Sequence, residues 1–321
     1  MNQIGLIGFG EQGIKAVSEV SSGSCIEVEK YFVDNDLEIL KRYASDEKAI
    51  LSDYFYEGNE WEPGSEIRRL LKDEEMEKAA VTFTQKFSIL IFVTGLGGSM
   101  SLAAKELADF VKKNCPGTSI YFMCSLPFHE ETDYRHNFLA RRVLQFLKEN
   151  QVGWTVIEND RIFQRYYAKL EDAYKNSYMF MTYLLNSLFS LFGSGTWNSK
   201  IDFHEIKDLI GRGLVYISVW NDEDFVPENS DIILNEWLPY EPDCTTGKNF
   251  MSVGISRGVR IPGLLKRINS IGEKCFSDQS SFSCRIYYKQ DSGCDSRIVL
   301  ATAGMEKSGR NISVREILYL T

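Results

Sequence analysis

The sequence is short of the residues from which metal sites and disulfide frameworks are built. It has 3 histidines and 7 cysteines among 321 residues. His129, His136 and His204 do not share the spacing of metal ligands, and no two cysteines form a CxxC or CxH pair. An odd number of cysteines without such spacing is typical of a protein kept in a reducing compartment. We therefore expect reduced thiols, a cytoplasmic location and no resident metal site.

A basic excess and a long hydrophobic run are also missing. The formal net charge is −9, with lysines and arginines dispersed among acids, which argues against nucleic acid or an anionic membrane surface as the main partner. The longest apolar stretch, 178–192, is interrupted by polar residues and is shorter than the roughly 20 residues that span a bilayer. It fits a helix buried between two layers of structure. Met1 runs directly into an apolar strand pattern, so we expect neither a cleaved signal nor a transmembrane segment.

Strand and helix patterns alternate through the first half of the chain. Apolar runs indicate strands at 4–7, 28–33, 87–93, 119–123 and 154–157. Helical periodicity indicates helices at 14–20, 37–43, 65–79, 102–114 and 137–150. This alternation predicts an α/β fold, Rossmann-like, with a mainly parallel sheet covered on both faces. Ligands of such sheets bind beyond the carboxyl ends of the strands.

The second half predicts a smaller α+β domain. A helix is expected from about residue 202 and further helical residues near 262–271. The expected strands are 214–219, 250–255, 284–289 and 297–303. The apolar stretch at 178–192 would form a long, buried central helix between the two halves.

A first glycine-rich turn follows the first strand, in GLIGFGEQGIKAV at residues 5–17. Gly8, Gly10 and Gly13 form GxGxxG, and Asp34 follows Gly13 by 21 residues. This matches the dinucleotide fingerprint, in which backbone N–H groups bind phosphate and the acid bonds the ribose. Close packing of the helix on the strand is the alternative use of these glycines. Phosphate binding is the favoured interpretation.

A second glycine-rich turn lies in VTGLGGSMSLAA, residues 93–104, and contains Gly95, Gly97 and Gly98. An NAD-dependent oxidoreductase would use the first turn alone, and the second half offers no convincing catalytic constellation for one. Two glycine loops can instead surround a triphosphate. The pair of turns therefore indicates a nucleoside triphosphate site.

With both turns in place, the chain resembles the FtsZ and tubulin superfamily over residues 3–220. The resemblance rests on GFGEQGIKAV, YFVDNDLEIL, GNEWEPGSEIRRLLKDEE, LPFHEETDYRHNFLARRVLQFL, WTVIENDRI and SKIDFHEIKDL. It implies a nucleotide-binding domain over 1–175, a central helix and loop over 176–200, and a C-terminal activation domain over 201–321. It also implies GTP with Mg²⁺ as ligand and head-to-tail self-association into filaments.

The resemblance also assigns site residues. It places Glu131 at the acid that contacts the ribose and Arg135 near the phosphates. Tyr174 takes the position of an aromatic residue that stacks on guanine, and Tyr178 the position of an acid that bonds the base. The substitution by Tyr178 removes a bidentate acceptor for guanine. Burial in the helix core is the alternative role of both tyrosines.

The second turn departs from the family signature GGGTGTG. The corresponding residues are GGSMSL, in which Ser99 and Ser101 keep the hydroxyl positions while Met100 and Leu102 replace glycines. Side chains at those positions resist positive φ and close backbone approach. The turn either binds phosphate in an altered conformation or packs as core, with binding slightly favoured because the first turn and Arg135 remain.

Two acids near residue 200 bear on catalysis. Asp202 and Glu205, at i and i+3 of a helix start, match the acids with which this family completes the active site of the next subunit. Helix capping is the alternative role of acids at such a position. In the family context, the catalytic role is favoured.

The function expected from the sequence is a cytoplasmic, FtsZ-like GTP-binding protein that forms filaments, with weak or absent GTP hydrolysis. A non-catalytic scaffold of the same fold is the alternative, and an NAD-dependent oxidoreductase is the second. We expect the chain to lack the long linker and the C-terminal adaptor peptide of division FtsZ. A specialised filament role is therefore favoured over the division ring, and a membrane adaptor is a candidate partner.

Overall fold

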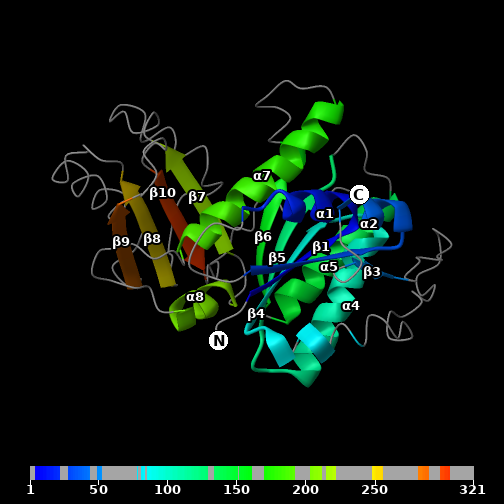
Figure 1. Ribbon diagram of the computed structural model, residues 1–321, viewed down its shortest axis with the longest axis horizontal. Helices are drawn as coiled ribbons and strands as arrows, with labels where there is room; N and C mark the ends of the chain where they lie inside the picture. Colours follow the sequence, from blue (N-terminus) through cyan, green and yellow to red (C-terminus); the bar gives the residue numbers. More distant parts are fainter. Residues whose placement is uncertain are drawn as a thin grey trace. The chain divides into compact units, whose positions relative to one another are not determined.

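The computed structural model describes residues 4–21, 28–43, 49–52, 78, 81–83, 85–128, 134–150, 152–160, 170–191, 203–211, 215–221, 248–255, 281–288 and 297–303. The chain divides into two compact units, Met1–Leu185 and Asn186–Thr321. Helix α7 (Leu170–Leu191) runs from the first unit into the second, and Figure 1 shows the elements of both.

The first unit is built on a six-stranded sheet in the order β3-β2-β1-β4-β5-β6. Every neighbouring pair is parallel, which confirms the predicted α/β fold class. The strands are β1 (Ile4–Phe9), β2 (Val28–Asp34), β3 (Ala49–Leu51), β4 (Ile89–Gly95), β5 (Ser119–Leu126) and β6 (Gly153–Glu158). β3 was not predicted, because 3 residues are too few to show a periodic pattern.

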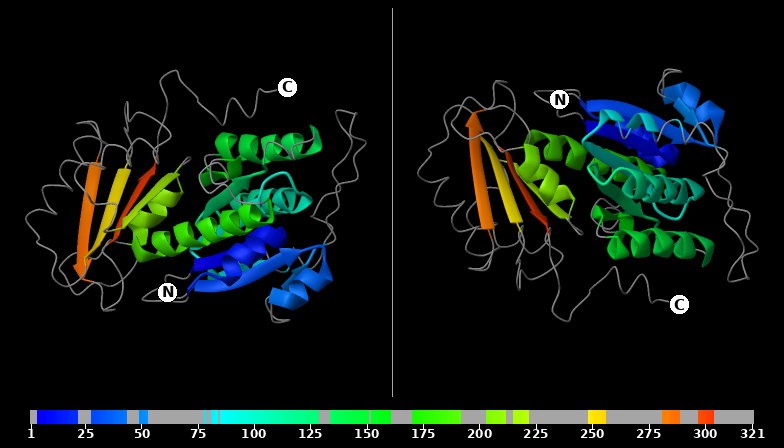
Figure 2. Two further views of the ribbon diagram at one scale, coloured as in Figure 1. Left: turned by 90° about the horizontal axis from the view of Figure 1, so that it is seen from above. Right: turned by 90° about the horizontal axis from the view of Figure 1, so that it is seen from below.

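The central strands are apolar runs because both of their faces are buried. All of β1 is buried, as is β4 up to its last residue. On one face the ring of Phe92 lies between those of Phe9 and Phe122, with centroids 5.2 and 5.1 Å away. Helices α4 and α5 cover one face of the sheet, and α1 and α7 cover the opposite face (Figure 2).

Four further helices of the first unit are described over their full length. They are α1 (Gly10–Ser18), α2 (Leu37–Tyr43), α4 (Ser99–Asn114) and α5 (Tyr134–Glu149). α1 and α4 begin earlier than the apolar periodicity predicts, because each starts inside its glycine turn. The helix expected at 65–79 lies outside the described residues except for Lys78, which is helical.

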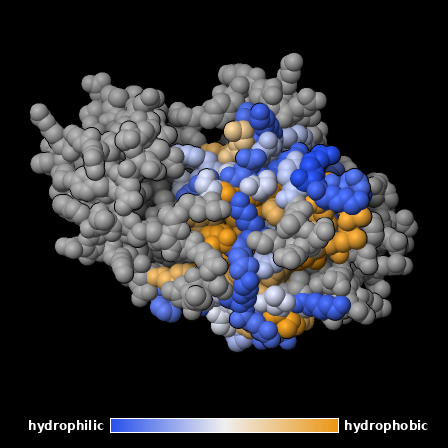
Figure 3. Space-filling view, in the orientation of Figure 1, coloured by the Kyte–Doolittle hydropathy of each residue, from blue (hydrophilic) through white to orange (hydrophobic). Residues whose placement is uncertain are grey.

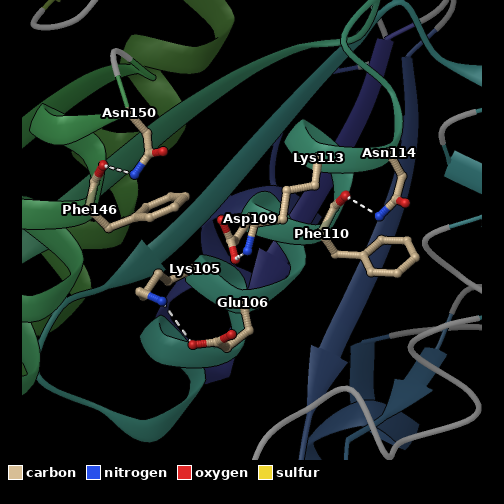
Figure 4. Close-up of polar contacts among 8 residues, drawn as sticks. All are labelled: Lys105, Glu106, Asp109, Phe110, Lys113, Asn114, Phe146 and Asn150. Carbon is tan, nitrogen blue, oxygen red and sulfur yellow. Dashed lines mark hydrogen bonds and ion pairs between the residues drawn. The ribbon is translucent and has the colours of Figure 1, made fainter.

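Polar contacts between residues close in sequence stabilise α4 (Figure 4). Lys113 pairs with Asp109, one turn earlier, at 2.6 Å. Asn114 Nδ2 donates to the carbonyl oxygen of Phe110 at 2.8 Å, which satisfies a backbone acceptor of the last turn. Hydrophilic side chains of this kind alternate with hydrophobic ones over the described residues of the first unit in Figure 3.

The second unit holds a four-stranded mixed sheet in the order β7-β10-β8-β9. β10 is antiparallel to β7 and β8, whereas β8 and β9 are parallel. The elements are α8 (Phe203–Ile210), β7 (Val215–Asn221), β8 (Lys248–Ile255), β9 (Ser281–Tyr288) and β10 (Arg297–Ala303). All five lie close to their predicted positions, while the helical residues expected at 262–271 lie outside the described residues. Across the described ranges, no helix combines the length and apolarity needed to cross a membrane.

Candidate functional site

The two glycine turns lie side by side at the carboxyl edge of the parallel sheet. β1 and β4 are neighbours, and Gly8 and Phe9 pair in register with Val93 and Thr94. The sheet grows outward from this pair in both directions, through β2 and β3 on one side and through β5 and β6 on the other. Open parallel sheets bind their ligands at such a switch point.

The first turn starts α1 and packs it closely on the sheet. Gly10 has a φ of 69°, in the left-handed region that favours glycine. A Cβ atom on Gly8 would lie 2.6 Å from the carbonyl oxygen of Gly13, and one on Gly13 would overlap the carbonyl oxygen of Val93. Gly8 and Gly13 therefore allow α1 to pack closely on the sheet, whereas Gly10 allows the backbone conformation of the turn.

Neither α1 nor α4 has a side-chain cap at its N-terminus. Phe9 and Gly98 are the N-cap residues, and neither position shows a side-chain cap hydrogen bond. The first N–H groups of a helix lack an intrahelical acceptor and carry partial positive charge. Glu11 lies in the first turn of α1, whereas α4 has no acid there. Both helix starts therefore offer donors at one edge of the sheet.

The open part of the second turn is Gly98 and Ser99. Gly98 is exposed, with no atom within 4 Å of an added Cβ, and Ser99 is half-buried. Gly97 has a φ of 100°, and a Cβ there would lie 3.3 Å from the Cβ of His136 in α5. Ser101 is fully buried, and its hydroxyl donates to the carbonyl oxygen of Gly98 at 2.6 Å. Of the two hydroxyl positions, Ser99 is the one on the open side.

Met100 and Leu102 form the packed part of the same turn. Both residues are helical and buried, with exposed fractions of 6% and 1%. A Cβ atom on Gly10 would lie 3.2 Å from the Cβ of Met100, so Met100 packs against the first turn. Core packing thus holds for these two residues, while Gly98 and Ser99 remain accessible.

Asp34 ends β2 beside the first turn, since Val33 pairs with Phe9 in register. Its side chain is engaged locally: Asp34 is only 4% exposed, and Oδ1 accepts the N–H of Asp36 at 3.0 Å. Burial raises the pKa of Asp34, and the N–H groups of Asp36 and Asn35 partly offset that shift. This geometry gives Asp34 a turn-forming role, and its contact with a ribose stays a prediction.

Three hydrogen-bonded side chains, a polar chain that the sequence patterns did not predict, link α1 to α7. Gln12 Nε2 donates to Ser177 Oγ at 2.7 Å, and Ser177 Oγ donates to Asn159 Oδ1 at 2.5 Å. The amide oxygen of Gln12 also lies against Gly95. Ser125 pairs with Gly95 in register, and its buried hydroxyl has no hydrogen-bond partner among the described residues. The only sequence signal for this polar chain is Asn159 in the VIENDRI motif.

The two tyrosines predicted at the base site are one turn apart on α7. Tyr174 is 39% exposed, and its ring meets that of Phe128 edge-on at 5.1 Å. Tyr178 is half-buried, with Lys15 Nζ 5.9 Å from its ring centre. An exposed ring supported from one side can stack on a base. No sequence motif pointed to Lys15 as a site residue.

The structure describes only some of the remaining predicted site residues. Arg135 is exposed in the first turn of α5, next in sequence to the His136 that packs on Gly97. Glu131 and Asp202 lie outside the described residues. Glu205 lies in α8, where only its backbone is described.

Comparisons with known proteins place the fold. No protein-family model matches the sequence, and no curated protein matches it significantly. The structure is similar to an empty FtsZ dimer from M. jannaschii, at 19% identity and a TM-score of 0.77, over 95% of this chain and 89% of the other. It is similar to the GDP-bound CetZ1 monomer of Haloferax volcanii, at 17% identity and a TM-score of 0.69, over 98% and 97%.

A third similar structure is a GTPγS-form protofilament of TubZ from Bacillus thuringiensis serovar israelensis. The identity is 14% and the TM-score 0.74, over 99% of this chain and 90% of the other. Identities this low establish the fold alone. The chain has the fold of FtsZ, CetZ and TubZ, and the resemblance seen in the motifs is confirmed at that level.

Proposed function

We propose that the protein binds a guanine nucleotide at the two glycine turns and assembles into FtsZ-like filaments. The observation that carries this proposal is the meeting of two uncapped helix N-termini where Met100 packs on Gly10. Negative charge at a helix N-terminus is stabilised by about 0.3–1 kcal/mol at an exposed site. Glycine turns before a helix bind phosphate in P-loop and dinucleotide-binding folds.

The residues around the turns fit a nucleotide. Gly98 and Ser99 would contact the phosphates, because open space and uncapped N–H groups coincide there. Arg135 would add positive charge from the start of α5. The exposed ring of Tyr174 would support the base. Together these residues would form the nucleotide-binding part of a domain over 1–175.

The similar structures support the choice of ligand and the assembly. CetZ1 is bound to GDP, TubZ forms a GTPγS-form protofilament, and FtsZ is a dimer. We expect Mg²⁺ to accompany a triphosphate mainly through phosphate oxygens and water. No group of three His, Cys, Asp or Glu residues that could hold a metal occurs in the described part of the chain.

GTP hydrolysis is a separate part of the proposal. We expect it to be weak or absent, with Asp202 and Glu205 completing the site of a neighbouring subunit if it occurs. The cytoplasmic location and a membrane adaptor as partner stay expectations from the sequence.

A nucleotide-independent scaffold is the second candidate, and the burial of Met100 and Leu102 favours it. A turn whose helix start is partly core can hold its shape without a phosphate. In that case the chain would use the same fold for assembly alone.

Titration calorimetry of the full-length, nucleotide-stripped protein separates these candidates. GTP with Mg²⁺ is titrated first, with ATP and NADH as controls, and sedimentation follows in each condition. Binding of GTP together with GTP-dependent sedimentation supports the first proposal. Sedimentation without binding of any nucleotide supports the scaffold, and binding of NADH alone contradicts both.

A further inference from the structure

Lys15 is a cation held at the junction of α1 and α7. Its Nζ lies 2.7 Å from Glu11 Oε1 and 5.9 Å from the centre of the Tyr178 ring. The Lys15 side chain is 31% exposed, so it is confined yet accessible. The hydrogen bond with Glu11 raises the pKa of Lys15.

The alignment of α1 with α7 places the Lys15 ammonium group farther along α1 than the glycine turn that would bind phosphate. Gln12 contacts Ser177, and the hydroxyl of Thr182 donates to the carbonyl oxygen of Ala16 at 2.9 Å, so α1 and α7 run in the same direction. Tyr174 therefore lies toward the start of α1. Lys15 follows Gly10 by five residues, or about 7.5 Å of helix. A base resting on Tyr174 would turn its edge toward Tyr178 and Lys15.

The chemistry of an ammonium group limits which base edge it can read. Lysine has three donors and no acceptor. A purine with a keto group at C6 presents two neighbouring acceptors, N7 and O6, whereas adenine carries an amino donor in place of O6. The 2-amino group of guanine needs an acceptor instead. Glu11, the acid on this side of α1, is already paired with Lys15.

On the basis of the proposed nucleotide site, we propose that Lys15 selects the base by donating to N7 and O6 of a 6-oxopurine. Tyr178 holds the ammonium group in place through a cation–π contact, and Glu11 holds it through the ion pair. The 2-amino group then contributes little to affinity, because Glu11 is paired with Lys15. GTP and ITP are equivalent ligands, and ATP is a poorer one.

The test compares dissociation constants for GTP, ITP and ATP, measured by calorimetry on the full-length chain. We expect wild type to bind GTP and ITP within about twofold and ATP roughly tenfold more weakly. Lys15→Met should bind all three within about threefold, because the C6 preference is lost. Lys15→Arg keeps paired donors and should retain the preference. Lys113→Met is the matched control, since Lys113 forms the same i,i+4 pair with Asp109 at the far end of α4.

The failures of the two proposals are distinguishable. Equal binding of ATP and GTP by wild type overturns the role of Lys15 and leaves nucleotide binding intact. A preference of GTP over ITP of roughly tenfold does the same, because it shows that the 2-amino group is read. An unchanged ratio of GTP to ATP in Lys15→Met also overturns it. If wild type binds none of the three nucleotides, the proposed nucleotide site is wrong, and the proposed role of Lys15 is wrong with it.

Discussion

Met100 of α4 packs against Gly10 of α1, which brings the first turns of two helices into contact. The methionine stands where the FtsZ signature has glycine, yet it is helical and needs no positive φ. An unbranched, flexible side chain is suited to fill a gap of irregular shape. The contact explains how the second turn tolerates a large side chain while Gly98 and Ser99 stay open.

Replacing Gly10 by alanine should destabilise the protein by about 1–3 kcal/mol. The φ of 69° disfavours any Cβ, and the added atom would lie 3.2 Å from the Cβ of Met100. Urea unfolding measures the effect. Gly117→Ala is the matched control, because its Cβ meets no atom within 4 Å, and its stability should change by less than about 0.5 kcal/mol. Equal midpoints for the two variants would contradict the described turn.

Met100→Ala should cost about 2–5 kcal/mol of unfolding free energy, because it leaves a cavity between the two turns. Met179→Ala provides the comparison, since Met179 is 50% exposed on α7 and its truncation should cost less than about 0.5 kcal/mol. Both are measured by urea unfolding. Similar losses in the two variants would show that Met100 does not brace the turns.

Ser177→Ala should destabilise the first unit by about 1–3 kcal/mol, because it leaves Gln12 Nε2 and Asn159 Oδ1 without their buried partner. The control is Ser18→Ala, whose hydroxyl donates to the carbonyl oxygen of Lys15 near the end of α1. Amide hydrogen exchange in α1 and α7 should rise in the first variant and not in the second. Unchanged exchange in both helices would rule out the polar chain as their link.

The success of the sequence predictions depended on how far apart the interacting residues lie. β1 and β4 are long apolar runs that alternate with helices, so their burial and parallel pairing could be predicted locally. β3 has 3 residues and no period to detect. The link from Gln12 through Ser177 to Asn159 could not be predicted, because single polar residues carry no information about which distant partner they meet.

The glycines show the same division within the candidate site. Their positions predicted two turns at the carboxyl edge, and the structure contains both. Which glycine serves packing and which serves the turn depends on atoms supplied by other elements, such as the carbonyl oxygen of Val93 beside Gly13. Similarly, serine and methionine after Gly98 suggested an altered loop, whereas their backbone simply begins α4.

Asp34 should make stability depend on pH in a defined direction. Burial raises its pKa above the ordinary value of 3.8, so the folded state binds this proton more tightly than the unfolded state. Its stabilising contribution is therefore complete below the ordinary pKa and is lost as pH rises through the raised one. Asp34→Asn cannot ionise, so its stability relative to wild type should increase from about pH 3.8 toward neutral.

Thermal or urea unfolding of wild type and Asp34→Asn across this pH range measures that difference. The amide oxygen can still accept the N–H of Asp36, so the turn itself should persist. A difference between the two proteins that stays constant with pH would mean that the Asp34 carboxyl does not titrate differently on folding.

Hydrogen exchange with and without saturating GTP and Mg²⁺ shows whether a nucleotide contacts both glycine turns. We expect the amides of both glycine turns, in peptides covering 8–13 and 97–102, to exchange more slowly on binding, because a phosphate would accept from both helix starts. Peptides from the later turns of α4, residues 105–114, serve as the internal reference and should not change. GTP binding that leaves both glycine turns unprotected would contradict the account, because the nucleotide would then lie elsewhere.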